Sequence, residues 1–128
     1  MAASPTTTTG DDVVFAGLAK QAAMVRAGEV SSRELVELYL ERIARLDPQL
    51  NCYSVVLAER ALIEADQADS RRAAGDERPL LGVPVAIKDN TDVAGTVTTV
   101  GTAAHGPPAA QDAEQVRRLR SAGCVVLG

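Results

Sequence analysis

The fold is decided by the stretch Val83-Pro84-Val85-Ala86-Ile87-Lys88, a helix-like segment at 111–122, and the run Cys124-Val125-Val126-Leu127. The last run is apolar without polar alternation, as expected for a strand that is covered on both faces. A strand, a helix and a strand in this order predict a βαβ unit, in which the two strands are parallel and the crossover is right-handed. We therefore predict an α/β fold with a mixed or parallel sheet and covering helices.

Three amphipathic helices are expected before this unit, at 15–27, 31–47 and 58–74, with a short strand at 52–57. Ser31 and Glu34 have the spacing of a capping box. The second helix is expected to end at Asp47-Pro48, because proline disfavours the α conformation in the residue before it. Residues 1–12, rich in threonine, are predicted to be a flexible leader, and residues 13–128 to form the domain itself.

The composition excludes several classes of protein. Hydrophobic residues make up 46% and charged residues 23% of the 128 residues, as in soluble globular chains. A net charge of −4 and an aromatic content of 2% argue against a nucleic-acid partner. The chain has no apolar run of the length that a membrane span needs, so no membrane partner is expected. Cys52 and Cys124 are expected to be buried, reduced thiols, which favours a cytoplasmic location.

Lys88 is the residue most suited to chemistry. The chain has eleven arginines but only two lysines, so lysine is not its ordinary cation. A partly buried lysine can lose its proton near neutral pH and act as a base, whereas arginine cannot. The carboxyl end of a strand in an open α/β sheet is also where ligands bind. The alternative is a surface lysine at a strand end, paired with Asp89.

The residues around Lys88 resemble those of the amidase signature family. The resemblance rests on Leu81-Gly82-Val83-Pro84-Val85-Ala86-Ile87-Lys88-Asp89-Asn90, followed by Asp92-Val93-Ala94-Gly95 and Thr98-Thr99. The flanks 28–32, 50–53 and 122–128 are similar to that family in order and spacing, so that the resemblance covers roughly residues 14–128. It implies that this chain is the N-terminal part of an amidase domain, incomplete at its C-terminus.

The resemblance also implies a mechanism. In that family the strand lysine, which matches Lys88 here, takes a proton from a serine held by a cis peptide bond. That serine activates a second serine, which attacks the amide carbonyl, and backbone N–H groups of a Gly/Ser-rich loop hold the oxyanion. None of the six serines of this chain lies in such a loop. Only the lysine of the triad is therefore present, and the 128 residues alone are expected to be inactive.

Other polar residues offer less. His105 is the only histidine and has no partner at ligand spacing, so no metal and no cofactor are expected. Asp89, Asn90 and Asp92 are expected either to orient Lys88 and shape the site or to make ordinary turns. The residues that bind substrate cannot be named from this sequence.

Two functions remain open for the complete protein. The first is a free-standing amidase that hydrolyses a small-molecule carboxylic amide, with a homo-oligomer as a further option. The second is the glutamine-hydrolysing subunit of a tRNA-dependent amidotransferase, which works with partner subunits. The segment Thr91-Asp92-Val93-Ala94-Gly95 looks more like the free-standing amidases, since the amidotransferase subunits often carry cysteine near its first two positions. A truncated fragment without catalysis of its own is the third interpretation.

Overall fold

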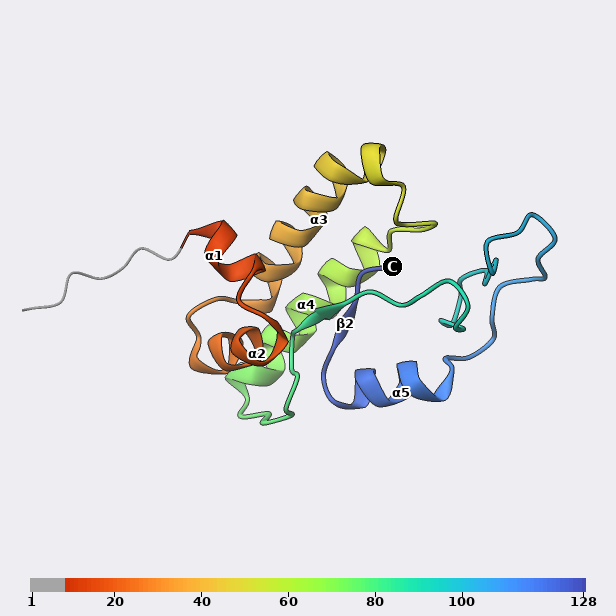
Figure 1. Ribbon diagram of the computed structural model, residues 1–128. Helices are drawn as coiled ribbons and strands as arrows, with labels where there is room; N and C mark the ends of the chain where they lie inside the picture. Colours follow the sequence, from red (N-terminus) through yellow and green to blue (C-terminus); the bar gives the residue numbers. More distant parts are fainter. Residues whose placement is uncertain (1–8) are drawn as a thin grey trace, which may run out of the picture.

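A computed structural model describes residues 9–128 (Figure 1). Five helices and two short strands follow one another in these residues: α1 (Gly10–Val14), α2 (Leu18–Ala27), α3 (Ser32–Leu50), α4 (Ala58–Ala73), β1 (Pro84–Val85), α5 (Glu114–Ser121) and β2 (Val125–Val126). The strands β1 and β2 are parallel, with Pro84 opposite Val125 and Val85 opposite Val126. The predicted βαβ unit is therefore present, with α5 as its helix.

Backbone hydrogen bonds extend the parallel pairing beyond the two strands. Gly82 N donates to Gly123 O at 2.8 Å before the strands, and Ile87 N donates to Gly128 O at 2.9 Å after them. The ladder thus reaches Ile87, close to the predicted strand end at residue 88. Pro84 has no N–H to contribute, which helps to explain why the regular strand is shorter than predicted.

Helices cover both faces of this small sheet. On one face, Val125 and Leu127 pack with Val36 of α3 and with the small residues Ala61 and Ala65 of α4. On the other face, a second cluster combines Val126 with Val116 of α5 and Val93 of the long loop. All four residues of the run 124–127 are buried, as their lack of polar alternation predicted.

Helices α3 and α4 lie side by side and antiparallel (Figure 1). The predicted capping box is present, because Ser31 Oγ accepts from the Glu34 amide and the Glu34 carboxylate accepts from the Ser31 amide. Asp69, near the end of α4, also accepts from the backbone amides of Ser32 and Arg33 at 2.8 and 3.0 Å. The first turn of α3 is therefore capped both locally and from the neighbouring helix.

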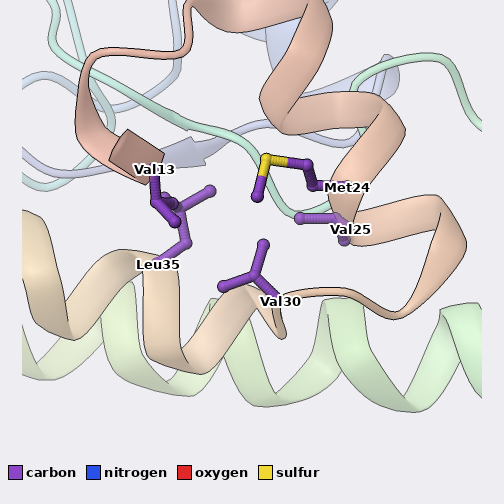
Figure 2. Packing of buried hydrophobic residues seen from close by; sticks show 5 residues of the cluster. All are labelled: Val13, Met24, Val25, Val30 and Leu35. Carbon is purple, nitrogen blue, oxygen red and sulfur yellow. The ribbon is translucent and has the colours of Figure 1, made fainter. Parts of the chain in front are cut away.

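A third apolar cluster joins α1 and α2 to the start of α3 (Figure 2). Val13, Met24, Val25, Val30 and Leu35 point toward one another there, and all five are buried. Val30 lies just before the cap residue Ser31 and Leu35 lies four residues after it, so their contact is a hydrophobic staple. It fixes the angle at which the chain enters α3.

The structure corrects several predicted boundaries near the N-terminus. Residues 1–8 of the predicted leader lie outside the described residues, but Thr9 caps α1, so residues 10–12 are helical. Phe15 ends α1 instead of starting the next helix, because Gly17, at φ 87°, separates α1 from α2. Helix α3 continues through Pro48 to Leu50 and ends at Asn51, whose left-handed conformation stops it. The proline removes one hydrogen bond in the last turn without ending the helix.

Two further predictions are wrong in detail. Residues 52–57 form no strand, because the Asp47 carboxylate binds the amides of Cys52 and Tyr53, at 2.6 and 3.3 Å, and turns the chain there. Helix α5 begins at Glu114 instead of residue 111, since the amide of Ala113 donates to Asp92 O at 2.9 Å in the preceding loop. None of the helices described is both long and apolar enough to cross a membrane.

Candidate active site

Lys88 lies at the carboxyl end of β1, one residue beyond the last hydrogen bond of the ladder. It lines a cleft of about 760 Å³. The cleft is formed by three segments of the chain and by Gly128, two residues beyond β2; the segments are Asn51–Val55, Ala86–Asn90 and Val100–Gly101. The site therefore occupies the edge at which ligands bind in parallel sheets, as predicted.

The side chain of Lys88 differs from its expected setting. It is exposed, not partly buried. Within residues 9–128 it forms no ion pair with any carboxylate, including that of its neighbour Asp89. The alternative interpretation is confirmed in its surface position for Lys88, but its ion pair with Asp89 is not present in this structure. The Lys88 amino group lines the cleft and, within residues 9–128, is not engaged in an ion pair, so it is available to a reacting group.

Asp89 is directed to the threonine-rich loop instead. Its carboxylate accepts a hydrogen bond from Thr99 N at 2.9 Å and a second one from the Thr99 hydroxyl. These two bonds hold the pKa of the Asp89 carboxyl below its ordinary value. Asp89 O also accepts from Val100 N at 2.9 Å. Residue 89 thus ties residues 99 and 100 to the end of the lysine strand.

Asn90 and Asp92 also act on the loop and not on Lys88. Asn90 Oδ1 accepts a 3.1 Å hydrogen bond from the Thr91 hydroxyl, and Asp92 Oδ1 accepts one of 2.6 Å from the Thr98 hydroxyl. Of the two expectations for residues 89, 90 and 92, the structure favours loop and turn chemistry, because their side chains accept hydrogen bonds from loop residues 91, 98 and 99. The Asp-x-x-Gly and Thr-Thr residues are thereby brought together by hydrogen bonds across the turn.

The opposite wall of the cleft comes from residues 51–55, which sequence reasoning did not assign to the site. Burial, followed by the nearby Asp47, raises the pKa of the Tyr53 hydroxyl. Cys52 is exposed on this wall, which corrects the expectation that it is buried. Cys124 is buried as expected, and burial raises the pKa of its thiol. The sequence shows that residues 51–55 follow α3. That they lie beside residue 128 and line the same cleft depends on the tertiary fold and could not be predicted from the sequence.

His105 lies on the exposed part of the long loop and is not among the residues that line the cleft. Its Nδ1 lies 3.4 Å from the carbonyl oxygen of Gly106. In the part of the chain that the structure describes, histidine, cysteine, aspartate and glutamate side chains form no group of three that could hold a metal ion.

A second set of polar contacts fastens the long loop to the helices. Arg60 of α4 donates to Ala94 O at 2.8 Å, and Asp112 accepts from Ala94 N, also at 2.8 Å. Arg120 of α5 joins Asp112 to Glu64 through ion pairs of 2.9 and 2.7 Å. The loop that carries the cleft residues is thus held both at Asp89 and at Ala94.

Comparison with known proteins shows which family the chain resembles. The family model described as Amidase matches residues 34–128. A protein of Mycobacterium tuberculosis (strain ATCC 25618 / H37Rv) named "Putative amidase AmiB2" is 55% identical over 117 residues, which are 91% of this chain and 25% of that protein. A glutamyl-tRNA(Gln) amidotransferase subunit from Halorhodospira halophila is 46% identical over 112 residues, which are 87% of this chain and 23% of that protein.

Solved structures agree with this assignment. The native peptide amidase of Stenotrophomonas maltophilia superposes with a TM-score of 0.82 at 41% identity, over 89% of this chain and 24% of that chain. An amidase family protein of Bacillus anthracis gives a TM-score of 0.83 at 33% identity, over 93% and 24%. The chain spans about a quarter of the length of the curated relatives it matches. By sequence and by fold, the chain belongs to the amidase signature family.

Proposed function

We propose that the complete protein hydrolyses a carboxylic amide to the acid and ammonia or an amine, with Lys88 as the base of a Ser–cisSer–Lys triad. The observation that carries this proposal is the position of Lys88, at the carboxyl end of β1, open to the cleft and without a carboxylate partner in residues 9–128. Lysine, unlike arginine, can lose its proton and so act as a base.

In the proposed reaction, neutral Lys88 Nζ takes the proton of the bridging serine, which takes the proton of the attacking serine. The attacking oxygen forms a bond to the amide carbon, and the C–N bond breaks as the leaving nitrogen receives the proton. Water then attacks the acyl-enzyme ester by the same route and releases the acid. Lys88 contributes the proton relay only. The two serines and the oxyanion loop belong to the part of the family's domain that this chain does not match.

A second candidate is the glutamine-hydrolysing subunit of a tRNA-dependent amidotransferase. The observation in its favour is the 46% identity to the glutamyl-tRNA(Gln) amidotransferase protein of Halorhodospira halophila. The segment Thr91–Gly95, which lacks cysteine, favours the free-standing amidase. The two functions differ in substrate and in dependence on partners, because the amidotransferase protein is expected to hydrolyse glutamine only with its partner subunits. We also propose a cytoplasmic location, which the two free thiols support.

A graft enzyme tests the proposal. In it, this chain replaces the matching quarter of the Stenotrophomonas maltophilia peptide amidase, so that the serines come from the scaffold. We expect ammonia release from peptide amides, without partner subunits, and its loss in Lys88→Ala. The 128 residues alone are expected to release none. A graft enzyme that is folded, with a cooperative melt near that of the scaffold, and yet inactive would contradict the proposal, and activity on glutamine alone would favour the second candidate.

A further inference from the structure

Val100 has an unusual backbone. Its φ is 51°, in the left-handed region, which is a genuine outlier for a β-branched residue. Its side chain is also 65% exposed, although it is large and apolar. Val100 belongs to none of the three apolar clusters, so core packing does not account for it. Strained residues that persist in a fold are concentrated at ligand-binding and catalytic positions.

The strain is held by contacts that start at the residue next to Lys88. The amide of Val100 donates to Asp89 O at 2.9 Å, and the Asp89 carboxylate binds both the amide and the hydroxyl of Thr99. The amide of Gly101 donates in turn to Thr99 Oγ1 at 3.3 Å. Three successive amides, at residues 99–101, are therefore satisfied by Asp89 and Thr99. Hydrogen bonds to a carboxylate are stronger than those between neutral groups, so the bonds from Thr99 to Asp89 can hold the strained backbone of the turn in place.

The result of this arrangement is an apolar side chain at the rim of the lysine cleft. Val100 lines the cleft together with Lys88, and the other apolar groups that line it are Tyr53, Val55, Ala86 and Ile87. Because Asp89 follows Lys88 directly, the position of Val100 is tied to the position of the proposed base. A substrate that binds in this cleft therefore has the exposed Val100 side chain within its binding surface.

We propose that Val100 is a specificity-determining residue, which contacts an apolar group of the amide substrate, and that Asp89 and Thr99 are positioning residues that hold it there. The substrate class is an amide with an aliphatic or aromatic side group close to the scissile bond. This inference rests on the proposed function, because it takes the cleft at Lys88 as the amidase site. It goes beyond that function in naming the chemistry that the cleft selects.

The test uses the graft enzyme and two kinds of substrate, N-acetylglycinamide and the N-acetyl amides of leucine and phenylalanine. In Val100→Ala we expect kcat/KM to fall about tenfold for the apolar amides, through KM, and to stay within about twofold for the glycine amide. Thr99→Val, which keeps the shape but loses the hydroxyl, is expected to lose selectivity in the same direction. Thr99→Ser keeps the hydroxyl and is expected to keep the selectivity of the parent graft enzyme for apolar amides.

A readout independent of activity accompanies the kinetics. Hydrogen exchange at the amides of residues 99–101 is expected to accelerate at least about tenfold in Thr99→Val, and to remain unchanged in Thr99→Ser. Asp76→Asn is the matched control, because Asp76 is also a half-buried carboxylate bound by a backbone amide and a side chain, both from Arg78, and does not line the cleft. It is expected to alter neither selectivity nor exchange at 99–101.

Two results would overturn the inference. One is an equal loss on all three substrates in Val100→Ala together with a lower melting temperature, which would make Val100 a packing residue against the scaffold. The other is unchanged selectivity in a folded Val100→Ala enzyme. Lys88→Arg separates this inference from the proposed function. If that variant keeps full activity, Lys88 is not the base of the reaction. The difference in kcat/KM between the apolar amides and the glycine amide in Val100→Ala then still tests the role of Val100 independently.

Discussion

Ser32 Oγ donates a 2.7 Å hydrogen bond to the carbonyl oxygen of Gly82, fifty residues further along the chain. Ser32 is fully buried, and Gly82 has a φ of 79°. A Cβ atom at Gly82 would lie 2.7 Å from Ser32 Cβ, closer than such atoms approach. The pair therefore fixes the first turn of α3 against the start of the strand that ends at Lys88, and it does so at a separation that only glycine permits.

Both partners of this contact are expected to be sensitive to substitution. Ser32→Ala leaves a buried carbonyl without its partner and should lower the free energy of unfolding by about 1–3 kcal/mol. Gly82→Ala adds a steric clash to an unfavourable φ, so we expect a larger loss than for Ser32→Ala. Urea unfolding of the chain measures both. Gly75→Ala is the control, since its φ is also positive, at 91°, but a Cβ there meets nothing within 4 Å. Equal losses at Gly75 and Gly82 would contradict the account of a steric contact.

The ion pairs of Arg120 are expected to stabilise the fold more than those of the α5 surface. The side chains of Arg120, Glu64 and Asp112 are 21%, 19% and 17% exposed. Removing Arg120 therefore leaves two largely buried carboxylates without their partner. Arg120→Met should lower the free energy of unfolding by about 1–3 kcal/mol. Arg118→Met, whose partner is Glu114 and whose side chain is 75% exposed, should change it by less than about 1 kcal/mol. Chemical unfolding of the two variants measures these losses in the free energy of unfolding. A similar loss in Arg120→Met and Arg118→Met would contradict the prediction that the Arg120 ion pairs stabilise the fold more.

The charge on Glu114 predicts an acid-dependent contact at the start of α5. Hydrogen bonds from Arg117 and then Arg118 lower the pKa of Glu114 from 4.5 to about 2. Because the folded state holds the proton less tightly than the unfolded state, the contribution of this contact to stability is complete above pH 4.5. It is lost as the pH falls from about 4.5 toward 2.

A carbon-detected NMR titration of the Glu114 carboxyl measures this pKa directly. Glu114→Gln should remove the contribution of this site to the pH dependence of unfolding between pH 4.5 and about 2. Arg117→Gln should move the pKa part of the way back. A carboxyl that titrates at 4.5 in the folded chain would show that the contacts with the two arginines do not persist in solution.

Much of the architecture could be predicted because it depends on local patterns. The cap at Ser31 and the staple of Val30 with Leu35 are fixed by spacing within a few residues. The parallel pairing of β1 with β2 followed from the order of the elements and the apolar run 124–127. Gly123, just after α5, has the positive φ, of 103°, for which a glycine at a helix end is typical, and a Cβ there would lie 2.5 Å from Leu81 Cα.

The errors lie where distant residues compete with local preference. Residues 52–57 have strand-like side chains, yet Asp47 binds the amides of Cys52 and Tyr53, and Leu57 N donates to the carbonyl oxygen of Leu127, the residue after β2. The contacts of Asp89 with Thr99 could not be foreseen, because Asp89 was assigned to Lys88 or to a local turn and Thr99 had no predicted role. Likewise, no local pattern shows that Val100 adopts a positive φ or that Tyr53 faces the same cleft as Lys88.

The most direct test of the account compares two matched substitutions in the graft enzyme, Lys88→Arg and Lys20→Arg, at the only two lysines of this chain. Arginine keeps the positive charge but does not lose its proton. If Lys88 is the base, kcat for amide hydrolysis should fall by about 10²-fold or more in Lys88→Arg and stay unchanged in Lys20→Arg, with equal melting temperatures. If Lys88→Arg keeps kcat within about threefold of the parent, Lys88 is not the base and the proposed mechanism is wrong for this protein.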